Sequence, residues 1–253
     1  MKKNLSAKVL NIVVPVLTVT TICLIWLIFA VSVGDEILLP TPIAVLKKFF
    51  ALLVDGRFYK AYLNTFVRSL IAFTCSFTIA LLFALISKFF EIPKKVIRTI
   101  VPLIRALPTI AVVLLLLLWT SSHVAPVIVT ALVILPTTYT SICEALSEID
   151  DGILEMCKVY GIDKKKQVLE VYIPIILPTV ITVIGSGISL NIKLMVAAEV
   201  LSQTVNSLGS LMQQAKIYFE SATLFALVLT SVITGLIFEN TGNFIAKRIR
   251  SKR

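Results

Sequence analysis

Four polar or charged side chains stand inside stretches that are otherwise apolar, and they are Arg68, Asn191, Lys193 and Glu199. An ionisable side chain is costly inside a hydrocarbon layer, so such residues usually mark a pathway for a solute or pair with one another. Helical spacing places Asn191 and Glu199 on one face, with Lys193 about 200° around the helix from Asn191. We therefore expect pathway or gate residues at these four positions, with Glu199 nearer a gate, and no pairing between Lys193 and Glu199.

Two roles remain open for Lys193: it offers a positive charge to an anionic substrate, or it pairs with a carboxylate on another helix or subunit. Arg68 lies one turn into its apolar stretch, where a long side chain can reach back to the membrane interface. Arg105 and Glu239 lie near the ends of their stretches, where ordinary anchoring explains them. The sequence therefore offers binding and pairing chemistry at these sites.

Residues for covalent catalysis or metal binding are scarce. His123 is the single histidine, and the sequence contains no HExxH, no GxSxG and no GxxxxGK[ST] phosphate loop. The cysteines show no CxxC spacing and are expected to be reduced packing residues; they are Cys23, Cys75, Cys143 and Cys157. We expect no enzyme activity, no metal and no cofactor bound by this chain.

The composition is that of an integral membrane protein. Hydrophobic residues make up 58% of the 253 residues and the mean hydropathy is +0.98, whereas soluble domains have about 45–50% apolar residues. The formal net charge is +10. Because the charges lie between apolar runs, they indicate membrane topology, and we expect no nucleic-acid partner.

Six stretches are long enough to cross a hydrocarbon core as helices, which predicts an all-α fold with one transmembrane domain over residues 1–253. The first is too long for a signal peptide and is expected to remain as a span. The spans are expected near 12–33, 66–86, 96–119, 124–142, 178–200 and 222–245.

Prolines and small residues predict the shape of two of these spans. Pro102 and Pro108 lie in the third, and prolines within a span bend or break it. Gly185 and Ser189 lie four residues apart in the fifth, which allows another helix to approach closely. We therefore expect a bent third span and a tightly packed fifth span.

Most of the Lys and Arg residues fall on the side of the membrane that carries both chain ends. Positively charged connections stay in the cytoplasm, so both termini are expected there, in a multi-pass protein of the cell membrane. In the connection after the first span, Ile43, Leu46, Phe50 and Leu53 recur at helical spacing. They predict a helix on the outer face, either part of a docking surface or a solvated connector.

A polar insert, residues 144–178, separates the fourth and fifth spans. Asp150 or Asp151 can cap a first short helix, and Gly161 can adopt the left-handed conformation that ends it. Asp163 can cap a second helix, which prolines at 174 and 178 either separate from the fifth span or lead into it. The insert is predicted to be a helix, a tight turn and a helix against the inner face.

The insert also carries a recognisable spacing. Glu155-Met156-Cys157 is followed after three residues by Gly161 and then by Val171-Tyr172-Ile173-Pro174. This resembles the motif Glu-Ala-Ala, three residues, Gly, nine residues, Ile, one residue, Leu-Pro of permeases of type I ABC importers. Met and Cys stand in place of the two alanines.

Other segments resemble one branch of that family, whose members handle nitrate, sulfonates, taurine, bicarbonate and thiamine precursors. Trp119-Thr120-Ser121 departs from the branch, which commonly has Trp-Phe-Gly there. The resembling segments are Leu39–Pro42, Asn64–Arg68, Ala198–Leu201 and Ser207–Gly209.

The resemblance implies that the helix ending at Gly161 is a coupling helix seated on a cytoplasmic ATPase subunit that binds the ATP. It further implies an extracytoplasmic solute-binding protein and a second permease copy, expected to form a homodimer. The solute would be a sulfonate-, nitrate- or taurine-like anion or a molecule like a thiamine precursor. The implied ATPase-coupling residues are Glu155, Met156, Cys157, Tyr160, Gly161, Ile173 and Pro174.

Two other classes of function stay open on the residues alone. A secondary transporter or channel driven by an ion gradient would also use charged residues within spans. A membrane-embedded enzyme is the weaker alternative, because no catalytic set is apparent.

Overall fold

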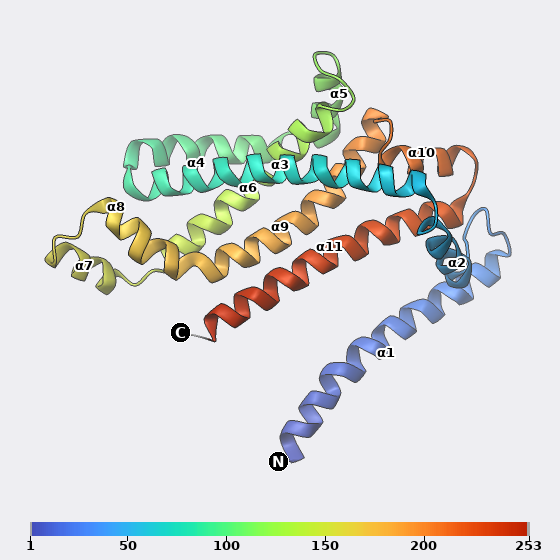
Figure 1. Ribbon diagram of the computed structural model, residues 1–253, viewed down its shortest axis with the longest axis horizontal. Coiled ribbons are helices and arrows are strands. Elements are labelled where there is room, and N and C mark those ends of the chain that lie inside the picture. The colour runs from blue at the N-terminus through green and yellow to red at the C-terminus, as the bar shows by residue number, and fades with distance from the viewer. Residues whose placement is uncertain (1, 252–253) are drawn as a thin grey trace. The chain divides into compact units, whose positions relative to one another are not determined.

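The computed structural model describes residues 2–251, and the side chains of residues 13–251 except those of 151, 154, 158 and 164. Within this range every regular element is helical, which confirms the all-α prediction (Figure 1). The chain divides into two compact units, one formed by Met1–Phe58 with Leu211–Thr230 and the other by Tyr59–Ser210 with Ser231–Arg253.

The first unit begins with α1 (Lys2–Val33), whose apolar part, Val13–Val33, is long enough to cross a membrane. The helix predicted after it is confirmed as α2 (Pro42–Leu52). Thr41 caps α2 by accepting a hydrogen bond from the amide of Ala44, and the proline at the first position suits a helix start.

The expected apolar stripe of α2 faces outward. Ile43 and Phe50 are 60% and 63% exposed, whereas Val45 is buried. The same unit contains the stacked rings of Trp26 and Phe225, whose centroids lie 5.6 Å apart.

Four further helices of the described chain are long and apolar enough to span a membrane. Three belong to the second unit along most of their length, and α11 passes from the first unit into the second. These elements are α3 (Gly56–Phe89), α6 (Ala125–Ser147), the continuous segment Lys165–Ser202 that contains α9 (Ile173–Ser202), and α11 (Ser221–Arg250).

The expected third span consists of two helices, α4 (Glu91–Ala106) and α5 (Thr109–Leu117), which meet at an angle of 87°. Leu107 between them has extended backbone angles, as a residue before proline prefers. The predicted bend of this span is therefore confirmed at Pro108, whereas Pro102 lies inside α4. With this bent pair counted as one span, the described chain has six candidate spans, in agreement with the sequence.

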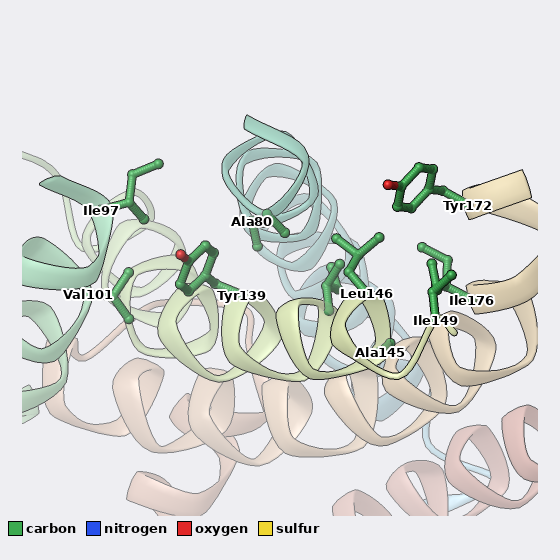
Figure 2. Packing of buried hydrophobic residues seen from close by; sticks show 11 residues of the cluster. Ala80, Ile97, Val101, Tyr139, Ala145, Leu146, Ile149, Tyr172 and Ile176 are labelled. Atoms are coloured by element: carbon green, nitrogen blue, oxygen red, sulfur yellow. The ribbon is translucent and has the colours of Figure 1, made fainter. Parts of the chain in front are cut away.

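The core of the second unit lies between α3, α4, α6 and the start of α9. Figure 2 shows Tyr139 of α6 between Val101 of α4 and Ala80 of α3, with Leu146 and Ile176 farther along the same layer. The Tyr139 hydroxyl forms a hydrogen bond with the buried Ser87 hydroxyl at 3.0 Å, which satisfies both polar groups. Close packing of this kind holds membrane helices together, because lipid tails are as apolar as the side chains.

The predicted close approach of the fifth span is confirmed where α9 meets the second-unit part of α11. A Cβ added at Gly185 would lie 3.0 Å from the Cα of Gly242, and one added at Gly235 would lie 2.8 Å from the hydroxyl of Ser189. The two backbones are therefore in direct contact at glycine positions.

The polar insert forms α7 (Asp151–Val159), α8 (Lys164–Gln167) and a π-helical turn (Val168–Tyr172) that continues into α9. The amide of Ile173 donates to the carbonyl of Val168, which is the i→i+5 hydrogen bond of a π turn. Pro174 has no backbone N–H to donate, and the wider turn accommodates it without ending the helix. Both prolines thus lead into the fifth span. The expected start near Pro178 was too late, because helical structure extends back to Lys165.

Candidate functional site

A fully buried carboxylate, Glu199, lies three residues before the end of α9. This end of α9 is the one far from α7 (Figure 1). Its Oε1 accepts a hydrogen bond from Nη1 of Arg68 at 2.8 Å, and its Oε2 accepts one from Oγ1 of Thr65 at 2.8 Å. The amide of Gly209, at the start of α10 (Leu208–Ile217), donates to Oε2 at 3.4 Å. Three donors from two other helices therefore converge on one carboxylate.

Arg68 extends this network, because its guanidinium group turns toward Glu199 of α9. Only 15% of the Arg68 side chain is exposed. Nη1 of its guanidinium group pairs with Glu199, and Nη2 lies 3.1 Å from Nδ1 of His123. An arginine donates from both nitrogens, so Nδ1 of His123 is the acceptor. We call Thr65, Arg68, His123, Glu199 and Gly209 the Glu199 cluster.

The turn between α9 and α10 brings Gly209 against Glu199. Gln203 and Asn206 have positive φ angles of 51°, which reverse the chain, and Ser207 and Ser210 cap α10 by reciprocal amide-to-hydroxyl hydrogen bonds. A Cβ added at Gly209 would lie 2.5 Å from the Cβ of Glu199. Only glycine allows α10 to begin at this distance from α9.

The predicted face of α9 is confirmed in its geometry. Asn191 and Glu199 are both fully buried and both turn toward α3, where the side-chain amide of Asn191 donates to the carbonyl and the hydroxyl of Ser69 at 2.6 Å. Lys193 lies on the exposed side of α9, and no described residue forms a hydrogen bond or ion pair with its ammonium group. Its expected lack of pairing with Glu199 is confirmed, because Glu199 pairs with Arg68.

At the other end of this unit, local sequence explains the shape of α7. Asp150 accepts a hydrogen bond from the amide of Gly152 at 2.8 Å and so caps the start of the helix. Gly161 has φ of +62°, and the amide of Ile162 donates to the carbonyl of Cys157 at 2.9 Å. This is the long-range bond of a Schellman motif, which ends the helix sharply as the sequence predicts.

The outward side of α7 is apolar. Met156, Val159 and Tyr160 are 59%, 83% and 76% exposed, and they follow one another at helical spacing, whereas Cys157 is buried. Glu155 is exposed beside them. Farther along the chain, Ile173 is 40% exposed. A short helix with exposed apolar side chains at a sharp turn can dock into a groove of another protein.

Sequence reasoning identified Arg68 and Glu199 but missed their partners. Thr65 lies three residues before Arg68, and Gly209 lies ten residues after Glu199. Both residues belong to segments that resemble the family, so the sequence pointed to the segments. It did not indicate that these residues contact Glu199. His123 offered no signal beyond being a lone histidine. The described residues hold no group of three His, Cys, Asp or Glu side chains that could bind a metal.

The chain matches the family described as the binding-protein-dependent transport system inner membrane component over residues 76–251. A protein of Brucella melitensis named as a probable ABC transporter permease is 24% identical over 220 residues, which cover 83% of this chain and 89% of that protein. A permease protein of Bacillus subtilis named for aliphatic sulfonates transport is 20% identical over 229 residues, covering 89% and 82% of the two chains.

Solved structures share the fold. A bacterial ABC transporter for the import of the acidic polysaccharide alginate superposes with a TM-score of 0.67 at 15% identity, covering 98% of this chain and 99% of that chain. The MetNI methionine ABC transporter superposes with a TM-score of 0.61 at 19% identity, covering 79% of this chain and 97% of that chain. With the family match covering more than half of the sequence, this chain belongs to the inner membrane components of binding-protein-dependent transport systems, the non-catalytic permease subunits of ABC transporters.

Proposed function

We propose that this chain is the permease subunit of an ATP-driven importer and forms the path of a small solute across the cell membrane. Cytoplasmic ATPase subunits bind the ATP, a solute-binding protein delivers the solute, and a second copy of the chain completes the path. The observation that carries the proposal is the exposed patch of Met156, Val159 and Tyr160 on α7, in a chain of this family. Tyr160 and Gly161 lie at the end of the helix, where the patch meets the turn.

The charge distribution supports the same orientation. In the sequence, Lys and Arg residues concentrate in the connections around α7 and near both chain ends, so we expect each of these segments to face the cytoplasm, where the ATPase subunits are. Lys193 supports a path shared between subunits. Its charge is exposed within an apolar span, and a lysine at such a depth faces water or protein.

The names of three similar proteins support a binding-protein partner and a class of solute. One solved alginate ABC transporter is in complex with an alginate pentasaccharide-bound periplasmic protein. Permeases of Bacillus subtilis and Escherichia coli named for aliphatic sulfonates transport, 20% and 23% identical, favour a sulfonate-like anion as the solute class over a thiamine precursor.

Cross-linking tests the coupling role. In a chain whose native cysteines are replaced, Met156→Cys should cross-link to a cysteine in the ATPase subunit of the purified complex. The matched control is Lys95→Cys, which is exposed on α4 at the same end. Cross-linking from both positions or from neither would contradict docking by α7. Transport that persists when ATP hydrolysis is blocked would instead favour an ion-gradient-driven transporter.

A further inference from the structure

Two adjoining cavities of about 230 and 300 Å³ lie between the end of α3, the length of α4 and the second half of α6. Arg98, Tyr139, Cys143 and Ser147 line both, so the two cavities adjoin at these residues. We call the pair of them the α4–α6 cavity. It lies at the end of the second unit that carries α7, because α6 ends four residues before α7 begins.

The lining of the α4–α6 cavity is strongly basic. Lys88, Lys94, Arg98 and Arg105 line it, against one carboxylate, that of Glu144. From Lys94 to Arg105 the cations extend about 16 Å along α4, at a rise of 1.5 Å per residue. A solute in this space would therefore meet positive charge from Lys94 to Arg105, along most of α4.

Several of these cations already have partners, and one does not. Lys94 pairs with Glu91 at 3.0 Å, Lys88 donates to the carbonyl of Leu146 at 3.1 Å, and Arg105 donates to the hydroxyl of Thr140 at 2.9 Å. No described residue forms a hydrogen bond or ion pair with Arg98, whose five donors are available at the junction of the two cavities.

Hydroxyl groups also line the cavity. The buried hydroxyls of Ser87 and Tyr139 are hydrogen-bonded to each other. The exposed Ser147 hydroxyl, which donates to the carbonyl of Glu144, follows Tyr139 on the same face of α6. A planar guanidinium with hydroxyls nearby matches the oxygen geometry of sulfonate, sulfate or phosphate groups. Arg105, which the sequence explains as an ordinary anchor, lines this space together with Arg98 of the same helix, as cations on the path of a charged solute do.

We propose that the α4–α6 cavity binds the oxyanion group of a small soluble solute on its way to the cytoplasmic side, with Arg98 as the main contact. The inference rests on the proposed function, because it assigns the solute class and a position on the path. It also identifies α4 as the element that selects the charge of the solute. Anionic lipid headgroups share the same chemistry, and the test separates the two sources.

Cys143 provides a native probe, because its thiol lines both halves of the cavity. The other three cysteines are replaced by alanine, and the permease–ATPase complex is placed in lipid nanodiscs of phosphatidylcholine. Cys143 is then labelled with two methanethiosulfonates of similar size, one with a sulfonate and one with a trimethylammonium group. The ratio of the two rates, relative to the ratio for a free thiol, reports the local charge and cancels the reactivity of the thiol.

We expect the anionic reagent to be favoured by about tenfold or more, because a basic cleft concentrates anions to that degree. Inorganic sulfate should protect Cys143 from labelling. Arg98→Gln should remove most of the preference and the protection without loss of fold, since Arg98 has no described partner. Lys95→Gln removes the same charge from the exposed side of α4, outside the cavity, and should leave both unchanged.

A rate ratio equal to that of the free thiol, or equal effects of Arg98→Gln and Lys95→Gln, would overturn the proposal. Labelling that is suppressed by phosphatidylglycerol in the nanodiscs and indifferent to sulfate would also overturn it, by assigning the cavity to lipid. These failures are distinct from failure of the proposed function. A complex that hydrolyses ATP in response to a loaded binding protein, yet shows no labelling preference, would remove this inference alone.

Discussion

At the scale of single residues, the Glu199 cluster shows how a membrane bundle holds a charge. A buried carboxylate is stable when its partners approach from fixed directions, and here Arg68 and Thr65 come from consecutive turns of α3 while Gly209 comes from α10. Thr65 also accepts a hydrogen bond from the amide of Leu208 at 2.9 Å. The cluster thus joins three helices through one carboxylate.

Removing Arg68 should leave Glu199 buried without a cation. We expect Arg68→Met to destabilise the protein by about 3–5 kcal/mol, the usual cost of breaking a buried pair from one side. Thermal unfolding followed by a thiol-reactive dye would measure this. Adding Glu199→Gln should recover much of the loss, because the amide is neutral and still accepts from Thr65.

Lys193→Met is the matched control, since it removes a cation from α9 that has no described partner. We expect the midpoint of thermal unfolding of Lys193→Met to stay near that of the unmodified chain. Equal losses for Arg68→Met and Lys193→Met, or a double variant as unstable as Arg68→Met, would show that the pair has no structural role.

At the scale of elements, α7 depends on one backbone conformation. Gly161 has φ of +62°, and no atom lies within 4 Å of a Cβ built there. A side chain at this position therefore meets strain in the backbone and no steric clash. The exposed patch of α7 keeps its direction only while the turn keeps this conformation.

Three variants of Gly161 distinguish the effect of the backbone conformation at the turn from the effect of adding a side chain. Gly161→Asn should retain most coupling, because asparagine tolerates the left-handed conformation. Gly161→Val should lose most of it, since a β-branched residue there is strained by about 1–2 kcal/mol or more, and Gly161→Ala should lie between the two. ATP hydrolysis stimulated by the loaded solute-binding protein is the measure. Loss of stimulation in the asparagine variant equal to that in the valine variant would argue against the turn.

Local patterns were sufficient to predict the caps, the bend and most spans, because each depends on residues within one or two turns. Asp150, Pro108 and Gly161 all behave as their chemistry dictates. The ion pair of Arg68 with Glu199 joins residues 131 positions apart. It was out of reach because the sequence does not state which helix faces which. The early start of the fifth span was missed because a π turn accommodates Pro174, an option that proline rules do not predict.

At the scale of the whole molecule, a single chain leaves charged and apolar surfaces that need partners. The side of α9 that carries Lys193 is exposed within a span, whereas lipid would not accept its charge. Together with the patch on α7, this surface is expected to be covered in a complex of several subunits.

A cysteine at position 193 should report the second copy. In a chain without native cysteines, we expect Lys193→Cys to form a cross-linked dimer with a short bis-maleimide in the assembled complex, because α9 of one copy would face α9 of the other across the path. Leu82→Cys, exposed on the apolar side of α3, should remain monomeric. A dimer formed equally from position 82, or none from position 193, would contradict a shared path along α9.

The continuous helix from Lys165 to Ser202 has a mechanical consequence. Its 38 residues form a rod of about 57 Å, roughly twice the thickness of a hydrocarbon core. One end adjoins α7 and the other carries Glu199. A tilt of ~10° about one end would move the other by ~10 Å over a rod of that length. We expect this rod to act as a lever arm, so that a small displacement of α7 would be magnified at the end of α9 that carries Glu199.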